Sequence, residues 1–287
     1  ASLADKDGLV SHGLGDWLAP ELEKMPPERY TSSCFRYQSL RIAELIACEL
    51  GESAQAMRFA REAGVVKAGI NRVYFPKGDG VLSIGSGHQT GYAMALAFGI
   101  VAPDLVAAVR RRLVAACEAN DARIAFGLFG SKYVFRQLSD AGRTDLAYRM
   151  MMRDEAPSYK AWVKRGWTTL PEDFHAGESR NHVMFSDFVA WSYQRLAGIR
   201  LAEDAGSTAA VPIGPNAFSE ILFKPEPIPQ LDWVRASVGT PYGAVEASWR
   251  RHGDTVSYRF VVPPGAMATL ELPERAPCRL PPGIHEL

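Results

Sequence analysis

Several features that mark common protein classes are missing from this sequence. Its 32 basic and 32 acidic residues leave no net charge, and no block of like charge suggests a nucleic-acid or membrane-surface partner. The densest basic run, residues 110–112, falls in a helical pattern and fits a solvated face. No apolar run approaches the roughly 20 residues that span a bilayer. Residues 1–8 lack the order of a secretory signal. We therefore expect a soluble protein and leave its compartment, cytoplasmic or exported, open.

Cysteine is scarce, and its spacing has no metal-binding or redox pattern. The chain has only Cys34, Cys48, Cys117 and Cys278, with no CxxC pair among them. The first three lie in amphipathic helical patterns, where buried free thiols are common. We expect thiols in the core and no structural disulfide.

The common catalytic motifs are also absent. There is no HExxH, GxSxG or Cys/His nucleophile pair, which excludes the usual metalloprotease and serine-hydrolase templates. The Gly-rich stretch 81–96 lacks both the P-loop lysine and a GxGxxG spacing, so its Gln89 and Thr90 are expected to cap a helix or to hydrogen-bond across a ring of helices. Catalysis by carboxylate side chains remains as the candidate chemistry.

The apolar pattern divides the chain into a helical part, 1–204, and a β part, 205–287. Up to about residue 200 apolar residues recur every three or four positions, and short loops favour neighbouring antiparallel helices. The pattern predicts helices at 31–50, 53–74, 88–99, 103–119, 130–141, 143–153, 157–165 and 181–197. Beyond residue 205, short alternating runs separated by Pro- and Gly-rich turns predict an antiparallel β domain.

Two loops carry candidate site residues. In GLGDWLAP, residues 13–20, Asp16 is a carboxylate and Trp17 has a flat apolar face of the kind that packs on a sugar ring. The alternative is a turn in which Trp17 anchors the core and Asp16 caps a helix. In the second loop, Pro171 favours an extended backbone that presents Glu172 and Asp173 in different directions.

His182 follows closely enough to share a pocket with Glu172. Taken alone, adjacent acids of this kind more often belong to a solvated loop, and such a histidine is more often a structural one.

Together these stretches resemble the later part of the catalytic region of α-L-rhamnosidases of glycoside hydrolase family 78. The matching stretches occur in the same order along the chain: GLGDWLAP, GSGHQTGYAMALAFGIV, AFGLFGSKYVFRQLSDAGRTDLAYRMM, APSYKAWVKRGWTTLPEDF, SRNHVMFSDFVAWSYQRLAGI and FKPEPIPQLDWVRASVGTPYGAVEASWRRHG. The resemblance implies an (α/α)6 barrel followed by a β-sandwich, which agrees with the helix and strand patterns.

The resemblance also assigns roles. Glu172 matches the general base of an inverting hydrolase, Asp16 and Trp17 match a loop that lines the sugar pocket, and His182 matches a histidine that contacts rhamnose. The implied substrate is a rhamnose-containing glycoside or oligosaccharide, and the implied mechanism uses no metal or organic cofactor. Pro171 and Phe174 stand where the family has aromatic residues, so the pocket wall is expected to differ.

Two expectations concern what the chain lacks. Residues 1–12 do not resemble the family's acid-bearing segment, and about eight helices are predicted where a full barrel has twelve. We therefore expect the helical domain to be incomplete and to be completed by a second chain or an upstream segment. Within this chain the candidates for the acid are Asp16 and Glu178.

Two alternatives to a rhamnosidase stay open. One is a non-catalytic relative that binds carbohydrate or a partner. The other is an unsaturated glycuronyl hydrolase, for which the motif loops offer little basic charge beyond Arg180.

Overall fold

The computed structural model describes residues 4–21, 25–83, 88–174, 179–201, 218–273 and 275–287. It divides the chain into a helical unit, Ala1–Phe185, and a second unit, Ser186–Leu287, which contains the β domain. The predicted boundary between residues 204 and 205 lies outside the described residues and stays a prediction.

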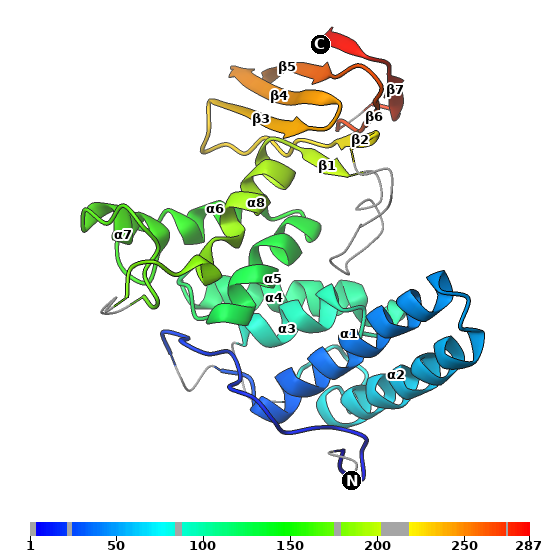
Figure 1. Cartoon of the computed structure of the whole chain (residues 1–287). Helices are drawn as coiled ribbons and strands as arrows, with labels where there is room; N and C mark the ends of the chain where they lie inside the picture. The colour runs from blue at the N-terminus through cyan, green and yellow to red at the C-terminus, as the bar shows by residue number, and fades with distance from the viewer. Residues whose placement is uncertain (1–3, 22–24, 84–87, 175–178, 202–217, 274) are drawn as a thin grey trace. The chain divides into compact units, whose positions relative to one another are not determined.

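The helical unit consists of helices joined by short connections, as the apolar periodicity predicts (Figure 1). Its helices are α1 (Glu28–Glu49), α2 (Ser53–Tyr74), α3 (Gln89–Ala97), α4 (Val106–Ala119), α5 (Leu128–Asp140), α6 (Thr144–Met151) and α7 (Tyr159–Lys164), with short 3₁₀ turns η2 (Pro103–Leu105) and η3 (Val183–Phe185). Gly51 and Gly142 take positive φ directly after α1 and α5, which ends each helix without strain.

The helices pack as sequential pairs around a buried helix. α1 lies along α2, while α3 contacts α1, α4 and α5, and α5 contacts α6. Every residue of α3 is buried, and its sequence is rich in Gly and Ala, so neighbouring helices approach it closely. The predicted arrangement of paired antiparallel helices is confirmed for these elements.

Two predicted helix boundaries are wrong. α1 begins at Glu28, three residues before the predicted start, and the hydroxyls of Thr31 and Ser33 donate to backbone carbonyls of its first turn. The predicted helix 181–197 is divided into η3, α8 (Asp187–Trp191) and a π-helical turn, η4 (Ser192–Leu196). His182 therefore precedes a 3₁₀ turn rather than beginning a long helix.

The β domain contains two four-stranded sheets. One has the order β1-β2-β6-β7 and the other β3-β4-β5-β8. The strands are β1 (Ile199–Leu201), β2 (Glu220–Phe223), β3 (Trp233–Thr240), β4 (Gly243–His252), β5 (Thr255–Val262), β6 (Met267–Leu270), β7 (Cys278–Leu280) and β8 (Gly283–Glu286). The short strands β1, β7 and β8 were not predicted. The described strand pairs are antiparallel, as expected, except that β2 pairs with β6 in parallel.

Both sheets contribute to one apolar core, which makes the domain a β-sandwich as expected. Ile221, Phe223 and Ala268 of the first sheet pack with Val245 and Phe260 of the second. The rings of Phe223 and Phe260 lie 4.7 Å apart. Side chains that alternate with these core residues along β3, β4 and β5 point to the opposite face.

The four cysteines are free thiols, so the prediction of no disulfide is confirmed. Cys34 and Cys117 are buried, and burial raises the pKa of each thiol well above its usual range. Cys48 and Cys278 are exposed, so the expectation that all four lie in the core is wrong for these two. Among the described residues, no helix combines the length and apolar character needed to cross a membrane.

Candidate active site

A buried carboxylate lies against the start of α5. Asp16 accepts hydrogen bonds from the backbone N–H groups of Gly127 (2.8 Å), Phe129 (2.8 Å) and Gly130 (3.1 Å), and from the hydroxyl of Thr90. N–H groups in the first turn of a helix have no partner within the helix and carry partial positive charge. Asp16 therefore caps α5 from a segment more than 100 residues away in the sequence.

Burial raises the pKa of Asp16, while the hydrogen bonds from Thr90 and the three N–H groups act in the opposite direction. The side chain is 0% exposed, so its carboxylate has no surface open to a sugar. The expectation that Asp16 itself lines a pocket is therefore corrected. The helix-capping alternative describes its geometry, and its contribution to a site is to hold the loop that carries Trp17.

The backbone of that loop is also attached to α5. The carbonyl of Trp17 accepts the N–H of Leu128 at 2.9 Å. A Cβ on Gly127 would lie 2.3 Å from the carbonyl oxygens of both Asp16 and Trp17, so only glycine permits this approach. The Trp17 side chain is 45% exposed, which excludes the alternative in which it anchors the core. The loop thus holds an indole ring at the surface on a fixed backbone.

Glu172 and His182 lie beside each other on two paired segments. The N–H of Glu172 donates to the carbonyl of Ser179 (2.9 Å), and the N–H of His182 donates to that of Leu170 (3.0 Å). A Glu172 carboxylate oxygen lies 3.9 Å from Nε2 of His182, and the two side chains are 39% and 28% exposed. The two side chains are therefore close together and partly exposed, and their shared role in a sugar pocket stays a prediction. Residues 175–178, including Glu178, lie outside the described residues.

Aromatic residues anchor the segment that follows Glu172 in the core. Phe174 is fully buried and stacks on Trp162, with ring centroids 4.6 Å apart, and it meets the edge of Phe185 at 4.9 Å. Phe174 therefore belongs to the core. The family resemblance had suggested instead that it lines the pocket wall. The apolar character of the residue was the available signal, but adjacent acids and a proline made the segment look like an exposed loop.

The two candidate loops are attached to the same end of α5. The hydroxyl of Ser131, in the first turn of α5, donates to the carbonyl of Met184 at 3.2 Å, two residues after His182. The same turn holds the Trp17 loop through Gly127 and Leu128. The hydroxyl of Tyr159 on α7 also donates to Phe185 at 3.0 Å. The first turn of α5 thus joins two segments that are far apart in the sequence, one carrying the indole and the other the Glu–His pair.

Further hydrogen bonds and cation–π contacts support these loops. The Gln89 side chain donates to the carbonyl of Arg123 (2.9 Å) and accepts the N–H of Ala125 (3.0 Å), so its predicted role in cross-linking is confirmed. The guanidinium of Arg180 lies over the ring of Trp167, 5.0 Å from its centroid. Within the described parts of the chain, no three His, Cys, Asp or Glu side chains are grouped so that they could hold a metal ion.

Comparisons with known families identify what these two units belong to. Residues 2–196 match the bacterial α-L-rhamnosidase 6 hairpin glycosidase domain, and residues 209–281 match the bacterial α-L-rhamnosidase C-terminal domain. Since the first match covers more than half of the chain, this chain belongs to the bacterial α-L-rhamnosidase family.

Individual relatives agree in sequence and in fold. An α-L-rhamnosidase of Formosa agariphila is 26% identical over 93% of this chain and 29% of its own length. The structure of an α-L-rhamnosidase from Dictyoglumus thermophilum has a TM-score of 0.79 at 25% identity, covering 93% of this chain and 30% of that one.

A Streptomyces avermitilis α-L-rhamnosidase, crystallised with L-rhamnose, has a TM-score of 0.77 at 24% identity, over 93% of this chain and 25% of its own, and supports the fold alone. The chain thus spans about 30% of the length of the curated relative.

Proposed function

We propose that this chain carries the base-bearing half of an inverting α-L-rhamnosidase site, which hydrolyses terminal α-L-rhamnose from glycosides or polysaccharides. The observation that carries the proposal is the pairing of accessible Glu172 with His182, 3.9 Å apart, on a loop attached to the same turn of α5 as the exposed Trp17. Membership of the family and the likeness to the α-L-rhamnosidase of Formosa agariphila support rhamnose as the sugar.

In this mechanism the Glu172 carboxylate accepts a proton from a water molecule as that water attacks the anomeric carbon. A carboxylic acid on the opposite side of the sugar protonates the leaving oxygen, at a distance of about 6.5–9.5 Å from the base. His182, beside Glu172, would donate a hydrogen bond to a sugar hydroxyl, and Trp17 would pack against the apolar face of the ring. No step uses a metal or an organic cofactor.

Of the two candidate acids in this chain, Glu178 lies outside the described residues, and Asp16 does not face a ligand. Asp16 is buried and engaged by four donors. The matched domain is named for six hairpins, whereas the described residues of the helical unit form the pairs α1/α2, α3/α4 and α5/α6 before α7. We propose that an upstream segment or a second chain supplies the remaining hairpins and the acid.

The test is the hydrolysis of an aryl α-L-rhamnoside by this chain and by any longer natural protein that contains it. Replacing Glu172 by Gln removes the base while keeping shape, so turnover is expected to fall by about 10²–10⁴-fold with the fold intact. Glu49→Gln, at an exposed position on α1, removes one charge from the surface and serves as the matched control. Wild-type turnover in the Glu172→Gln variant would exclude Glu172 as the base.

A second candidate function is a carbohydrate-binding relative without catalysis. The burial of Asp16 favours it, because this removes one of the two carboxyl groups considered as the acid. The two functions are distinguished by measuring L-rhamnose binding and turnover on the same preparation. Binding that depends on Trp17 and His182, without turnover in the longest natural protein, would support the binding function.

A further inference from the structure

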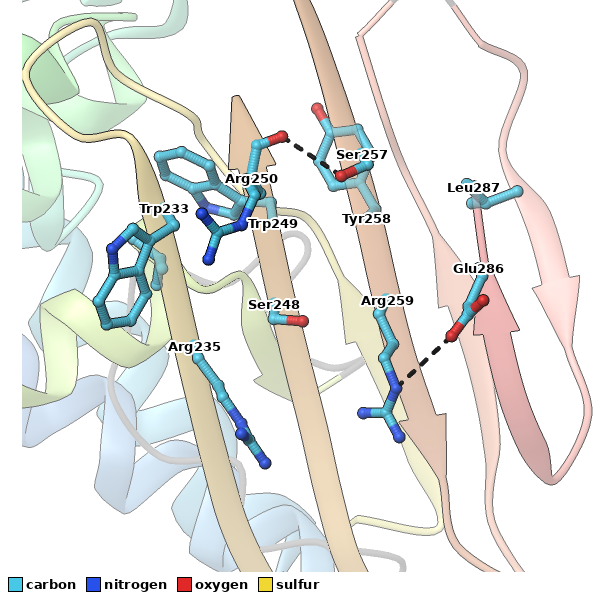
Figure 2. Close-up of a pocket in the computed structure, with 11 residues that line it drawn as sticks. Trp233, Arg235, Ser248, Trp249, Arg250, Ser257, Tyr258, Arg259, Glu286 and Leu287 are labelled. Carbon is cyan, nitrogen blue, oxygen red and sulfur yellow. Dashed lines mark hydrogen bonds and ion pairs between the residues drawn. The ribbon is translucent and has the colours of Figure 1, made fainter. Parts of the chain in front are cut away.

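The outward face of the sheet β3-β4-β5-β8 carries a groove of about 820 Å³ whose lining includes none of the candidate active-site residues (Figure 2). The strand register sets two neighbouring rows of side chains across this face. The first row is Trp233, Arg250 and Ser257, and the second is Arg235, Ser248, Arg259 and Glu286. These residues alternate with the ones that form the sandwich core, so they belong to the opposite face of the sheet.

Trp233 is the exceptional residue of this face. Its side chain is 56% exposed on the polar side of a sheet, where an indole would more often be covered. It lies at the beginning of β3, directly across from Arg250 on β4. Trp249, its neighbour on β4, is buried and donates from Nε1 to the carbonyl of Leu196 at 2.7 Å, so it has a structural role that Trp233 does not share.

The three arginines of the face differ in how they are paired. Arg259 is held by Glu246 at 2.8 Å and lies 3.9 Å from Glu286. Arg235 and Arg250 are exposed, and within the described part of the chain neither guanidinium forms a hydrogen bond or ion pair. Arg235 lies opposite Ser248, and Ser248 is two residues before Arg250 on β4. The two arginines are therefore diagonal neighbours, whose Cα atoms are expected to lie about 7–8 Å apart. The face therefore has two free guanidinium groups beside an exposed indole.

This combination selects a particular ligand chemistry. An indole packs against the C–H face of a pyranose ring, and a guanidinium binds a carboxylate through two parallel hydrogen bonds. Ser248 adds a hydroxyl group that can pair with a sugar hydroxyl, whereas the Ser257 hydroxyl is already bonded to His252 and to the carbonyl of Arg250. We propose that this face of the β domain binds an acidic oligosaccharide, one whose sugar residues carry carboxylates. The inference depends on the β domain alone and does not require that the chain hydrolyse rhamnosides.

The test measures binding of an oligogalacturonate to the full 287-residue chain by calorimetry; this oligomer contains no rhamnose, so the proposed hydrolysis does not consume it. The methyl ester of the same oligomer is the uncharged probe. The acid oligomer is expected to bind at least about tenfold more tightly than its ester, since each Arg–carboxylate pair is lost in the ester. Trp233→Ala and Arg250→Gln are each expected to weaken binding of the acid about tenfold.

A matched control separates the groove from general surface charge. Arg279→Gln also removes one exposed positive charge, but Arg279 lies on β7 in the other sheet, paired with Glu220 at 2.7 Å. Its affinity for the acid oligomer should equal that of the parent. Arg250→Lys keeps the charge without the planar fork and should restore only part of the affinity.

Three results would overturn the proposal. The first is equal affinity for the acid oligomer and its ester, or no binding of either. The second is the same loss of affinity in Arg279→Gln as in Arg250→Gln. The third is equally tight binding of a single-stranded DNA of similar charge through the same residues, which would assign the face to polyanions in general. Circular dichroism of each variant checks that these surface substitutions leave the fold intact.

Discussion

Asp16 shows how one carboxylate can define the shape of a site without facing its ligand. Its side chain has no exposed surface, and its oxygens accept hydrogen bonds from Thr90 and from three N–H groups at the start of α5. All four partners are donors. A buried acceptor in such surroundings is difficult to replace, because a substituted group either leaves donors unpaired or directs a second donor at them.

Asp16→Asn is therefore expected to destabilise the protein by about 1–3 kcal/mol, since its amide nitrogen would face N–H donors. Denaturant unfolding followed by circular dichroism measures the change. Asp254→Asn, at an exposed turn position, makes the same chemical change without buried partners and should leave the free energy of unfolding unaltered. Equal stability of the two variants would show that the cap contributes nothing.

The raised pKa of Asp16 also predicts a pH dependence. In the unfolded chain this carboxyl ionises near its ordinary pKa of 3.8, whereas burial keeps it protonated to higher pH in the folded state. The contribution of Asp16 to stability is therefore largest below the unfolded pKa and declines as pH rises through the folded pKa. The difference in unfolding free energy between wild type and Asp16→Asn should shrink over that window. A difference that grew with pH would contradict this assignment.

At the scale of elements, the first turn of α5 is the point where the candidate site is assembled. It contacts the Trp17 loop by backbone hydrogen bonds and holds Met184 through Ser131. Two glycines make the close approach possible. A Cβ on Gly127 would collide with the backbone of Asp16 and Trp17, and a Cβ on Gly130 would lie 2.3 Å from the Thr90 hydroxyl.

Gly127→Ala should displace the loop and destabilise the protein by about 1–3 kcal/mol, in the range of overpacking substitutions. Its φ of −97° lies outside the left-handed region that favours glycine, so the collision is the expected main cause. Gly64→Ala is the control, because Gly64 lies within α2 with open space around its Cβ position, and alanine there should stabilise by about 0.5–1 kcal/mol. The thermal unfolding midpoints of the two variants test this prediction. A higher midpoint for Gly127→Ala than for the wild type would show that the added Cβ does not collide with the loop.

At the scale of the whole molecule, the tip of the α1–α2 hairpin is apolar and exposed. Leu45, Ile46 and Leu50 lie at the end of α1, and Met57 lies at the start of α2. Neighbouring exposed apolar residues of this kind mark surfaces that another protein segment covers. The observation agrees with the proposal that further hairpins complete the barrel.

The chain by itself is therefore expected to self-associate as its concentration rises. Sedimentation velocity over a range of concentrations measures this, and Ile46→Lys combined with Leu50→Lys should shift the protein toward monomer. Val163→Lys changes an exposed apolar residue at the end of α7 and is the control. A chain that stays monomeric at every concentration would show that the apolar tip needs no partner.

The sequence by itself determined where most helices lie and where the chain changes to strands. Helix positions such as 53–74 were predicted because the apolar spacing of a helix is a property of neighbouring residues. The change to β structure was predicted for the same reason, although the three short strands β1, β7 and β8 have too few residues to show an alternation. The site candidates Glu172 and His182 were assigned by the resemblance to the family, and their closeness in the sequence indicated that they could share a pocket.

Only the tertiary structure decided how Asp16, Trp17 and Phe174 are used. The partners of Asp16 at Gly127 to Gly130 are more than 100 residues away, so the sequence around Asp16 could not distinguish a buried cap from a ligand contact. The exposure of Trp17 and the burial of Phe174 likewise could not be predicted from their neighbours in the sequence. Burial of a single side chain depends on which distant segment packs against it, and a local pattern does not contain that information.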